Sequence, residues 1–234
     1  MLYAGCSGYS FREWVGRFYP PKTKAKDYLP YYASQLNSVE INYSFRRFPK
    51  PELTESWARA TPESFKFSVK MHQRVTHRLR LKNVGEPILD FMEALSPLGP
   101  RLGVVLFQCP PTLKLDMERL EGFLEKLPKG PRFAMEFRHE SWDVDPVSER
   151  LHKAGVALCA ADVEIGEARR VITAPFAYMR LRKPPPYDEA EIASLQALLR
   201  QAQQEVDAIY LYVKHDEEGH APESVKKIRS AMSV

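Results

Sequence analysis

Acidic, basic and amide side chains stand near the carboxyl ends of several short apolar segments of this sequence. They are Glu40, Asn42, Lys70, Gln108, Glu136, Arg138, Asp162, Arg180 and Lys214. Carboxylates held in a site can accept and donate protons, so Glu40 and Glu136 are the candidate acid–base pair. Arginine presents a planar fork of donors that matches phosphate or carboxylate, so the cations are candidate anion ligands. The set predicts acid–base chemistry on a phosphate-bearing or other anionic small substrate.

Histidines and hydrogen-bonding groups complete this predicted site. His77 and His139 are candidate proton carriers, because an imidazole changes its charge near neutral pH. The remaining substrate contacts are expected from Asn42, Gln108, Tyr178 and His215. Three acids face four bases in the set, so a network of ion pairs that only stabilises the protein is an alternative interpretation.

A metal centre is a second use for the same acids and histidines. The candidate ligands are Glu40, His72 or His77, Glu136, His139, Asp162, His215 and Asp216. Zinc or manganese would need several of them to converge. No local ligand motif such as H-E-x-x-H is present, and four nearby cations would repel a divalent ion. We therefore expect no cofactor, with a divalent metal as the alternative.

A basic stretch at 70–82 points to a different partner. It carries Lys70, Arg74, Arg78, Arg80 and Lys82. Aromatic residues are expected in or near loops of the same face, at Tyr9, Trp14, Tyr43 and Trp142. Basic and aromatic side chains together can track phosphates and stack on bases. A nucleic-acid-binding protein, or a metal-dependent phosphodiesterase resembling endonuclease IV-type barrels, is therefore the alternative function.

Short apolar segments and segments of helical period alternate along the whole chain. The strand-length segments are 2–6, 38–42, 65–70, 102–108, 132–138, 156–162, 176–182 and 208–214. The helical segments are 27–36, 51–60, 84–95, 116–127, 146–154 and 189–206. Alternation of this kind favours parallel strands joined by crossovers. It predicts an α/β fold with one (β/α)₈ TIM-type barrel over residues 1–234, irregular at the sixth crossover, where 163–175 leaves little room for a helix.

The alternation of side chains along each strand predicts which residues face the interior of the barrel. Phe133 and Met135 form an apolar row toward the helices, which leaves Glu136 pointing inward. By the same parity Tyr210 and Tyr212 point inward. Active sites of such barrels lie at the carboxyl ends of the strands, where the polar residues fall.

Composition excludes several classes of protein. Of 234 residues, 44% are hydrophobic and 27% are charged, which is typical of a folded globular protein. No apolar run is long enough to cross a bilayer and no signal peptide is evident, so we expect a cytoplasmic protein with no membrane partner. The three cysteines are far apart, which favours neither a disulfide framework nor a zinc ribbon. The net charge of +4 tilts toward anionic partners.

The order of several short motifs resembles the YecE-like family, also called domain of unknown function 72. The matching pieces are Gly5-Cys6-Ser7-Gly8-Tyr9, Trp14, Phe18-Tyr19-Pro20, Tyr31-Tyr32, Val39-Glu40-Ile41-Asn42, Trp57, Thr61-Pro62, Phe65 to Lys70, Thr76-His77, Leu102 to Gln108, Pro110-Pro111, Glu136-Phe137-Arg138-His139, Ser141-Trp142, Asp162 and Tyr178-Met179-Arg180-Leu181. The resemblance spans essentially the whole chain and implies a TIM-type barrel.

The resemblance implies no activity, because that family is itself poorly characterised. Many of its members look like Asn-Asn followed by a Gly/Ala-rich stretch after the last strand, where this chain has Lys214 and His215. The sequence alone does not decide whether the protein is an enzyme. A barrel without catalytic activity is the third hypothesis, because a fold alone implies no chemistry.

Overall fold

Parallel strands form the centre of the molecule. The computed structural model describes residues 1–161, 171–230 and 232. Its strands are β1 (Leu2–Cys6), β2 (Ser38–Ile41), β3 (Lys66–Lys70), β4 (Leu102–Gln108), β5 (Arg132–Glu136), β6 (Ala157–Leu158), β7 (Ala160–Ala161), β8 (Phe176–Leu181) and β9 (Ala208–Val213). All ladders are parallel, and they give a sheet of order β1-β9-β8-β7 and a sheet of order β2-β3-β4-β5-β6. The protein is therefore a mixed α/β structure, as the alternation of segments predicts.

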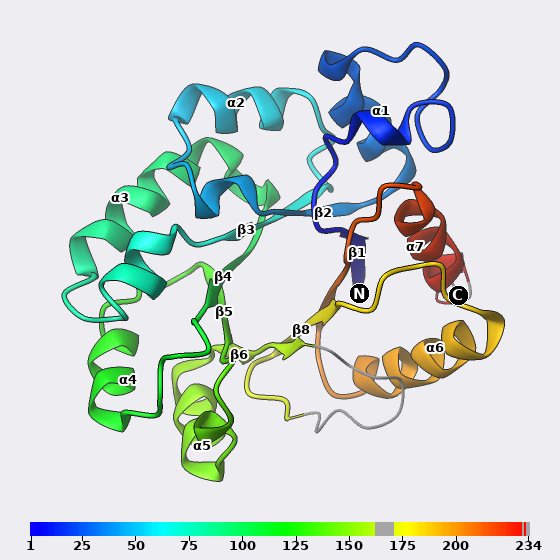
Figure 1. Cartoon of the computed structure of the whole chain (residues 1–234). Helices are drawn as coiled ribbons and strands as arrows, with labels where there is room; N and C mark the ends of the chain where they lie inside the picture. The colour runs from blue at the N-terminus through cyan, green and yellow to red at the C-terminus, as the bar shows by residue number, and fades with distance from the viewer. Residues whose placement is uncertain (162–170, 231, 233–234) are drawn as a thin grey trace.

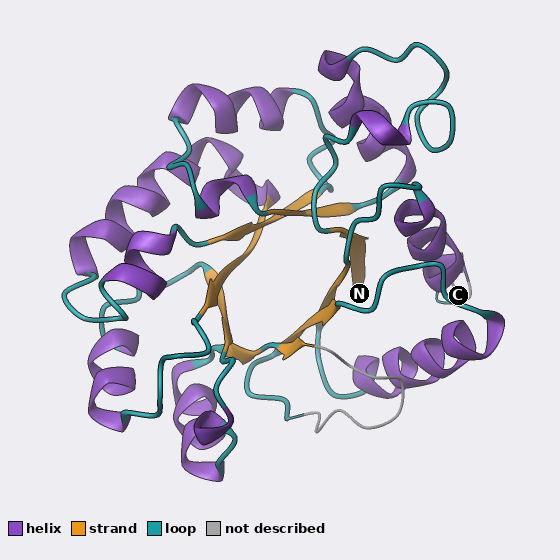
Figure 2. Ribbon diagram, in the orientation of Figure 1, coloured by secondary structure: helices purple, strands orange, loops and turns teal. Residues whose placement is uncertain are grey.

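Helices lie outside the strands, which surround a common interior (Figure 2). They are α1 (Tyr28–Gln35), α2 (Pro51–Arg59), α3 (Gly85–Leu95), α4 (Met117–Leu124), α5 (Asp145–Ala154), α6 (Glu189–Gln203) and α7 (His220–Ser230). Short helical turns are η1 (Arg12–Trp14), η2 (Ala25–Asp27), η3 (Tyr43–Phe45), η4 (Arg74–Arg78), η5 (Ser96–Arg101) and η6 (Glu140–Trp142), of which η4 is a π-helix. Within the described ranges, no helix combines the length and the apolar character needed to span a membrane.

One helix was not expected from the sequence pattern. α7 begins at His220, and Pro222 is tolerated there because the first turn of a helix needs no backbone donor. The carboxylate of Asp216 accepts hydrogen bonds from the backbone nitrogens of His220 (2.9 Å) and Ala221 (2.7 Å). Asp216, a candidate metal ligand in the sequence, therefore caps a helix.

The prediction of one continuous sixth strand over 156–162 is wrong. The backbone nitrogen of Cys159 donates to the oxygen of Met135 in β5 (2.8 Å), after which the chain leaves β5 and pairs with β8. The segment is thus divided into β6 and β7, which belong to different sheets. Most of the sixth crossover, and Asp162 with it, lies outside the described residues.

Two groups of buried side chains confirm the predicted parity. Phe133, Met135, Ile209 and Leu211 belong to the larger core between strands and helices. The inner group, enclosed by the strands, contains Val104, Leu106, Ala134, Tyr178, Tyr210 and Tyr212. The polar ends of the same strands therefore continue from an apolar and aromatic interior.

Side chains join the two sheets where β1 meets β2. Asn37 accepts a hydrogen bond from the nitrogen of Ala4 (3.0 Å) and donates one to the oxygen of Leu2 (2.9 Å). The hydroxyl of Tyr32 accepts from the nitrogen of Cys6 (2.7 Å) and donates to the oxygen of Ser38 (3.1 Å). These bonds satisfy backbone groups at a sheet edge, which would otherwise be costly to bury.

Candidate functional site

Two carboxylates and one guanidinium form the centre of the predicted site. Arg180 of β8 contacts both oxygens of Glu40 at 3.0 Å and donates to Oε2 of Glu136 at 2.6 Å. Both glutamates are buried, with exposed fractions of 0% and 1%. Burying charges is expensive unless they are paired and hydrogen-bonded, and all three guanidinium nitrogens of Arg180 have a carboxylate partner.

Further donors surround Glu136. The side chain of Gln108 donates to both of its oxygens (2.8 and 2.9 Å), and Nε of Arg138 donates to Oε1 at 2.9 Å. Gln108 and Glu136 are register partners at the ends of β4 and β5, which explains their contact. Burial alone would raise the pKa of Glu136, but Arg180, Gln108 and Arg138 outweigh burial and lower it. Glu136 is thus held as an ion.

Hydrogen-bond donors also surround Glu40. The amide of Asn42 donates to Oε1 (2.9 Å), and the hydroxyl of Tyr178 donates to Oε2 (2.8 Å). Burial, together with the charge of Glu40, raises the pKa of Tyr178 well above its ordinary value. Tyr178 therefore stays a donor at neutral pH and completes the shell around this carboxylate.

Lys70 extends the network toward the segment after β2. Its ammonium group donates to Oε1 of Gln108 at 2.6 Å and lies over the ring of Phe45, 3.9 Å from the ring centre. Burial and the positive charge of Arg180 lower the pKa of Lys70 from its ordinary value of 10.5 to about 8, against the opposing effect of Glu40 and Glu136. Lys70 is thus a cation that loses its charge just above neutral pH.

A pH titration of stability checks this placement of Lys70. The unfolded amine holds its proton up to about pH 10.5, whereas the folded amine releases it above about pH 8. The unfolded state binds more protons in that window, so the unfolding free energy of the wild type should rise from pH 8 to 10 relative to Lys70→Met. Urea unfolding of both proteins at pH 7 to 10 measures the difference between their unfolding free energies. Groups that titrate equally in both proteins cancel in this difference. Parallel pH curves would contradict the lowered pKa.

The predicted histidines lie in different surroundings. Nδ1 of His139 accepts a hydrogen bond from the nitrogen of Ser141 (3.1 Å), and His139 caps η6. His77 contacts the hydroxyl of Thr76 (2.8 Å), and its pKa is lowered by burial and by Lys70. The imidazole of His215, in contrast, lies at the pocket described next.

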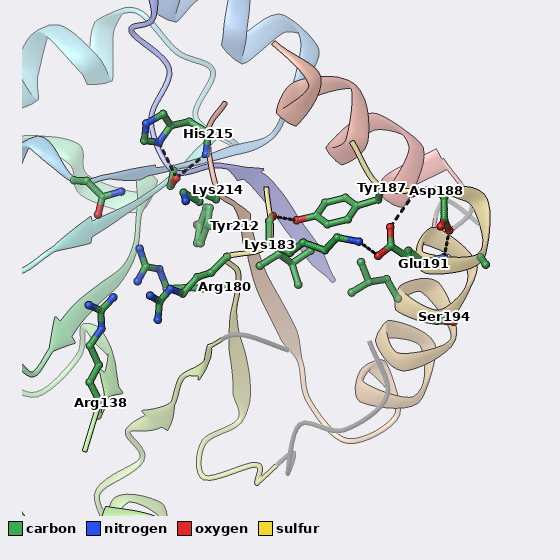
Figure 3. A pocket seen from close by; sticks show the side chains of 16 residues that line it. Arg138, Arg180, Lys183, Tyr187, Asp188, Glu191, Ser194, Tyr212, Lys214 and His215 are labelled. Atoms are coloured by element: carbon green, nitrogen blue, oxygen red, sulfur yellow. Dashed lines mark hydrogen bonds and ion pairs between the residues drawn. The ribbon is translucent and has the colours of Figure 1, made fainter. Parts of the chain in front are cut away.

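A pocket of about 1060 Å³ lies at the carboxyl ends of β8 and β9 (Figure 3). Of the sequence-predicted residues, Asn42, Arg138, Arg180, Lys214 and His215 line it. Glu40, Lys70, Gln108, Glu136 and Tyr178 are buried and bonded to one another or to these lining residues. His77 and His139 do not line the pocket, and Asp162 lies outside the described residues. The structure thus places a cationic surface on a buried, hydrogen-bonded support.

His215 is held at the rim of the pocket. Its ring stacks on Phe11, with 4.5 Å between ring centres, and its backbone nitrogen donates to the hydroxyl of Ser7 at 3.1 Å. Nδ1 lies 3.5 Å from the same hydroxyl. Burial and the neighbouring charge of Lys214 lower the pKa of His215, although Asp216 and Glu217 oppose them. A neutral imidazole able to accept a proton therefore faces the pocket.

One wall of the pocket consists of residues that the sequence pattern did not predict as part of the site. It is formed by the segment that leads into α6, with Lys183, Tyr187 and Asp188, and by the start of α6, with Glu191 and Ser194 (Figure 3). Asp188 and Glu191 form a capping box, since each side chain accepts a hydrogen bond from the backbone nitrogen of the other. The pattern D-x-x-E before a helical segment was the available signal for this wall.

Among the described residues, the two expected loop tryptophans are not exposed at the site, and the candidate metal ligands do not form a cluster that could hold an ion. Trp14 and Trp142 are buried, with exposed fractions of 0% and 3%, and they donate to the oxygens of Asp216 and Leu113. Neither tryptophan is available for stacking on bases. Among residues 1–161, 171–230 and 232, no group of three or more His, Cys, Asp and Glu side chains is arranged to hold a metal ion.

The fold and the site define an α/β protein with a cationic pocket at the carboxyl ends of its parallel strands. The chain belongs to the family described as protein of unknown function DUF72, whose sequence model matches residues 3–234. The YecE protein of Escherichia coli K12 is 26% identical over 206 residues, which are 86% of this chain and 73% of the relative. The YunF protein of Bacillus subtilis 168 is 32% identical over 159 residues, which are 64% of this chain and 55% of the relative.

Solved structures of the family share the fold. A DUF72 family protein of Thermotoga maritima MSB8 is 27% identical and covers all of both chains with a TM-score of 0.86. A DUF72 family protein of Enterococcus faecalis V583 covers 100% of this chain and 96% of its own, with a TM-score of 0.83 at 20% identity. The family resemblance read from the short motifs is thus confirmed, and the family carries no assigned activity.

Proposed function

We propose that the protein is an enzyme that acts on a small phosphate-bearing or carboxylate-bearing substrate in the pocket. The observation that carries the proposal is the convergence of Arg138, Arg180 and Lys214 on one cavity from the ends of β5, β8 and β9. The described part of the site holds six cations, Lys70, Arg138, Arg180, Arg182, Lys183 and Lys214, against four carboxylates, Glu40, Glu136, Asp188 and Glu191. The excess of positive charge favours an anion in the pocket.

The buried network supports binding rather than proton transfer. Glu40 and Glu136 are each bonded to several donors, so they hold Arg180 and Arg138 in place at the pocket. Proton transfer falls to His215, because it lines the cavity and its pKa is lowered. The substrate anion would lie between Arg138 and Lys214, within reach of that imidazole.

We also propose that the whole chain forms one closed (β/α)₈ barrel. Side-chain bonds across β1 and β2 and the continuous chain from β6 to β7 support closure of both sheets into a single-domain (β/α)₈ barrel. In such a barrel, the pocket lies at the face where catalytic residues are found. A cytoplasmic location stays a prediction from the sequence.

Ligand binding tests the proposed function directly. The probes are inorganic phosphate, a panel of sugar phosphates and a panel of small carboxylates, scored by thermal shift and then by calorimetry. We expect at least one probe to stabilise the wild type and Arg138→Gln or Lys214→Gln to weaken its binding about 10- to 150-fold, since a hydrogen bond to a charged group contributes about 1.5–3 kcal/mol. Lys129→Gln is the matched control, because Lys129 is exposed and precedes β5 at the opposite end of the strands.

Two results would overturn the proposal. One is the absence of any stabilising probe in both panels. The other is unchanged affinity in Lys214→Gln, a variant that leaves the buried network intact because Lys214 is exposed and outside it. Turnover of the best probe by the wild type, lost in His215→Gln with binding retained, would support the catalytic part.

A further inference from the structure

Two segments next to the site carry positive charge without any acidic residue. Residues 41–51 contain three lysines and arginines, residues 64–85 contain six, and neither range contains aspartate or glutamate. The whole chain has a net charge of only +4, so the charge is concentrated here. A concentration of this kind is the electrostatic footprint of a polyanion-binding surface.

The fold brings the two segments together. The first contains η3 and the second contains η4, and the α2 and α3 helices that follow them lie side by side (Figure 1). The rings of Phe45 and His77 meet edge to face with 4.9 Å between centres, and those of Phe48 and His72 with 6.0 Å. The cations next to Phe45 and Phe48 therefore lie near those next to His72 and His77.

Four arginines of these segments are exposed to solvent. They are Arg46, Arg47, Arg74 and Arg78. Within the part of the chain that the structure describes, none of their guanidinium groups forms an ion pair or a side-chain hydrogen bond. Their charge affects a neighbouring histidine. Burial is the largest cause of the lowered pKa of His72, and the charges of Arg78 and Arg74 lower it further. A hydrogen bond to the backbone of Arg46 acts in the opposite direction. The surface is thus positive and uncompensated.

Exposed aromatic rings accompany these arginines. The side chains of Tyr43 and Phe48 are 49% and 42% exposed. They are the two aromatic members of the small group of large exposed apolar side chains in the described residues, and both lie in the first basic segment. An exposed ring among arginines is the arrangement on which unpaired bases stack while phosphates are neutralised.

We propose that this basic surface, formed by Tyr43, Arg46, Arg47, Phe48, Arg74 and Arg78, binds single-stranded nucleic acid. The arginines bind successive phosphates, and Tyr43 and Phe48 stack on bases. A duplex keeps its bases stacked on one another, so the rings give the surface a preference for single strands. This inference goes beyond the proposed small-molecule function, because none of these six residues lines the pocket.

Salt dependence of binding tests the role of the arginines. Fluorescence anisotropy with a labelled 20-nucleotide single strand of mixed sequence, as DNA and as RNA, is measured from 50 to 200 mM NaCl. We expect the Arg46→Gln/Arg47→Gln/Arg74→Gln/Arg78→Gln variant to bind more weakly and to lose about 3 from the slope of log K against log salt, since each phosphate contact contributes about 0.7. The charge-matched control removes four exposed lysines elsewhere, Lys24, Lys26, Lys129 and Lys153, and should keep the wild-type slope.

Substitution of one ring tests stacking apart from charge. Tyr43→Ala should weaken binding of the single strand about 5- to 150-fold, the factor that corresponds to the loss of one stacked base. Tyr43→Phe keeps the ring and should bind like the wild type. Tyr43 is exposed, so both variants are expected to fold, which thermal unfolding checks.

Three outcomes of the oligonucleotide measurements would overturn the inference. They are no binding of the single strand at 50 mM NaCl, an equal loss in the lysine control and the arginine variant, and equal binding by Tyr43→Ala and Tyr43→Phe. Binding of phosphatidylserine vesicles through the same arginines without binding of the oligonucleotide would assign the surface to a membrane instead and also overturn it. Arg138→Gln/Lys214→Gln should keep the oligonucleotide affinity, which separates this surface from the pocket.

Discussion

Arg180→Met should lower the free energy of unfolding by about 3–5 kcal/mol at pH 7.5, because it leaves two buried carboxylates without their shared cation. Arg180 contacts both oxygens of Glu40 and one of Glu136, and methionine fills similar space without charge. For a chain of this length the loss corresponds to a fall in Tm of roughly 6–20 °C. Urea unfolding followed by fluorescence measures the free energy, and calorimetry the Tm.

A pH series identifies the cause of that loss. In the wild type, the lowered pKa of Glu136 contributes stability that is present above its ordinary pKa of 4.5 and is lost as pH falls through the lowered value. Without Arg180, the effect of burial, which raises the pKa of Glu136, is less opposed, so that carboxylate takes up a proton more readily and the penalty should shrink from pH 7.5 to 4.5. A penalty that is independent of pH would mean lost packing instead of unpaired charge.

An exposed ion pair provides the control. Arg59 contacts Glu55 at 2.7 Å on the surface of α2, with side chains that are 65% and 55% exposed. Such pairs contribute little because water screens them, so Arg59→Met should change the free energy of unfolding by less than about 1 kcal/mol. Equal losses in Arg59→Met and Arg180→Met would contradict the buried network as the source of stability.

Strand parity made the polar centre predictable. Glu136 and Arg180 occupy inward positions of their strands, and the strand ends meet on one face, so their proximity follows from the period of two. Parity also separated the inward Tyr212 from the outward Leu211. Both inferences need only the local pattern, which the apolar segments carry clearly.

Contacts that depend on the path of a loop could not be predicted in the same way. The sequence gives no sign that Asp216 turns to cap α7, because the cap depends on where the chain goes after β9. The division of the sixth segment at Cys159 depends on a change of neighbour from β5 to β8, which no apolar pattern records. The same holds for the wall around Asp188, which only the tertiary fold brings to the pocket.

The hydrogen-bond shell around the carboxylates changes the role that the sequence suggested for them. A residue type predicts that a glutamate can transfer a proton, but its pKa depends on how many donors surround it. Glu136 has donors from Gln108, Arg138 and Arg180, so the structure favours positioning over acid–base chemistry. His215 gains the proton-transfer role in the proposed function because it faces the pocket.

Gly5→Ala should cost about 3 kcal/mol or more, because the added methyl group would meet the backbone of β2. A Cβ at Gly5 would lie 1.9 Å from the oxygen of Ser38, 2.6 Å from its carbon and 2.9 Å from the hydroxyl of Tyr32. Backbone atoms of a strand cannot yield as the end of a flexible side chain can. The substitution therefore pushes β1 away from β2, where the two sheets meet, and breaks the hydrogen bond between Tyr32 and Cys6.

Hydrogen exchange distinguishes this local separation from general weakening. In Gly5→Ala, peptides that cover β1 and β2 should exchange faster than those of β4 and β5, and the Tm should fall. Gly122→Ala in α4 is the opposite control: nothing lies within 4 Å of its added methyl group, so the better helix former should stabilise the protein by about 0.5–1 kcal/mol. An unchanged Tm in Gly5→Ala would show that β1 and β2 do not approach so closely, and closure of the sheets into a barrel would then lose its strongest support.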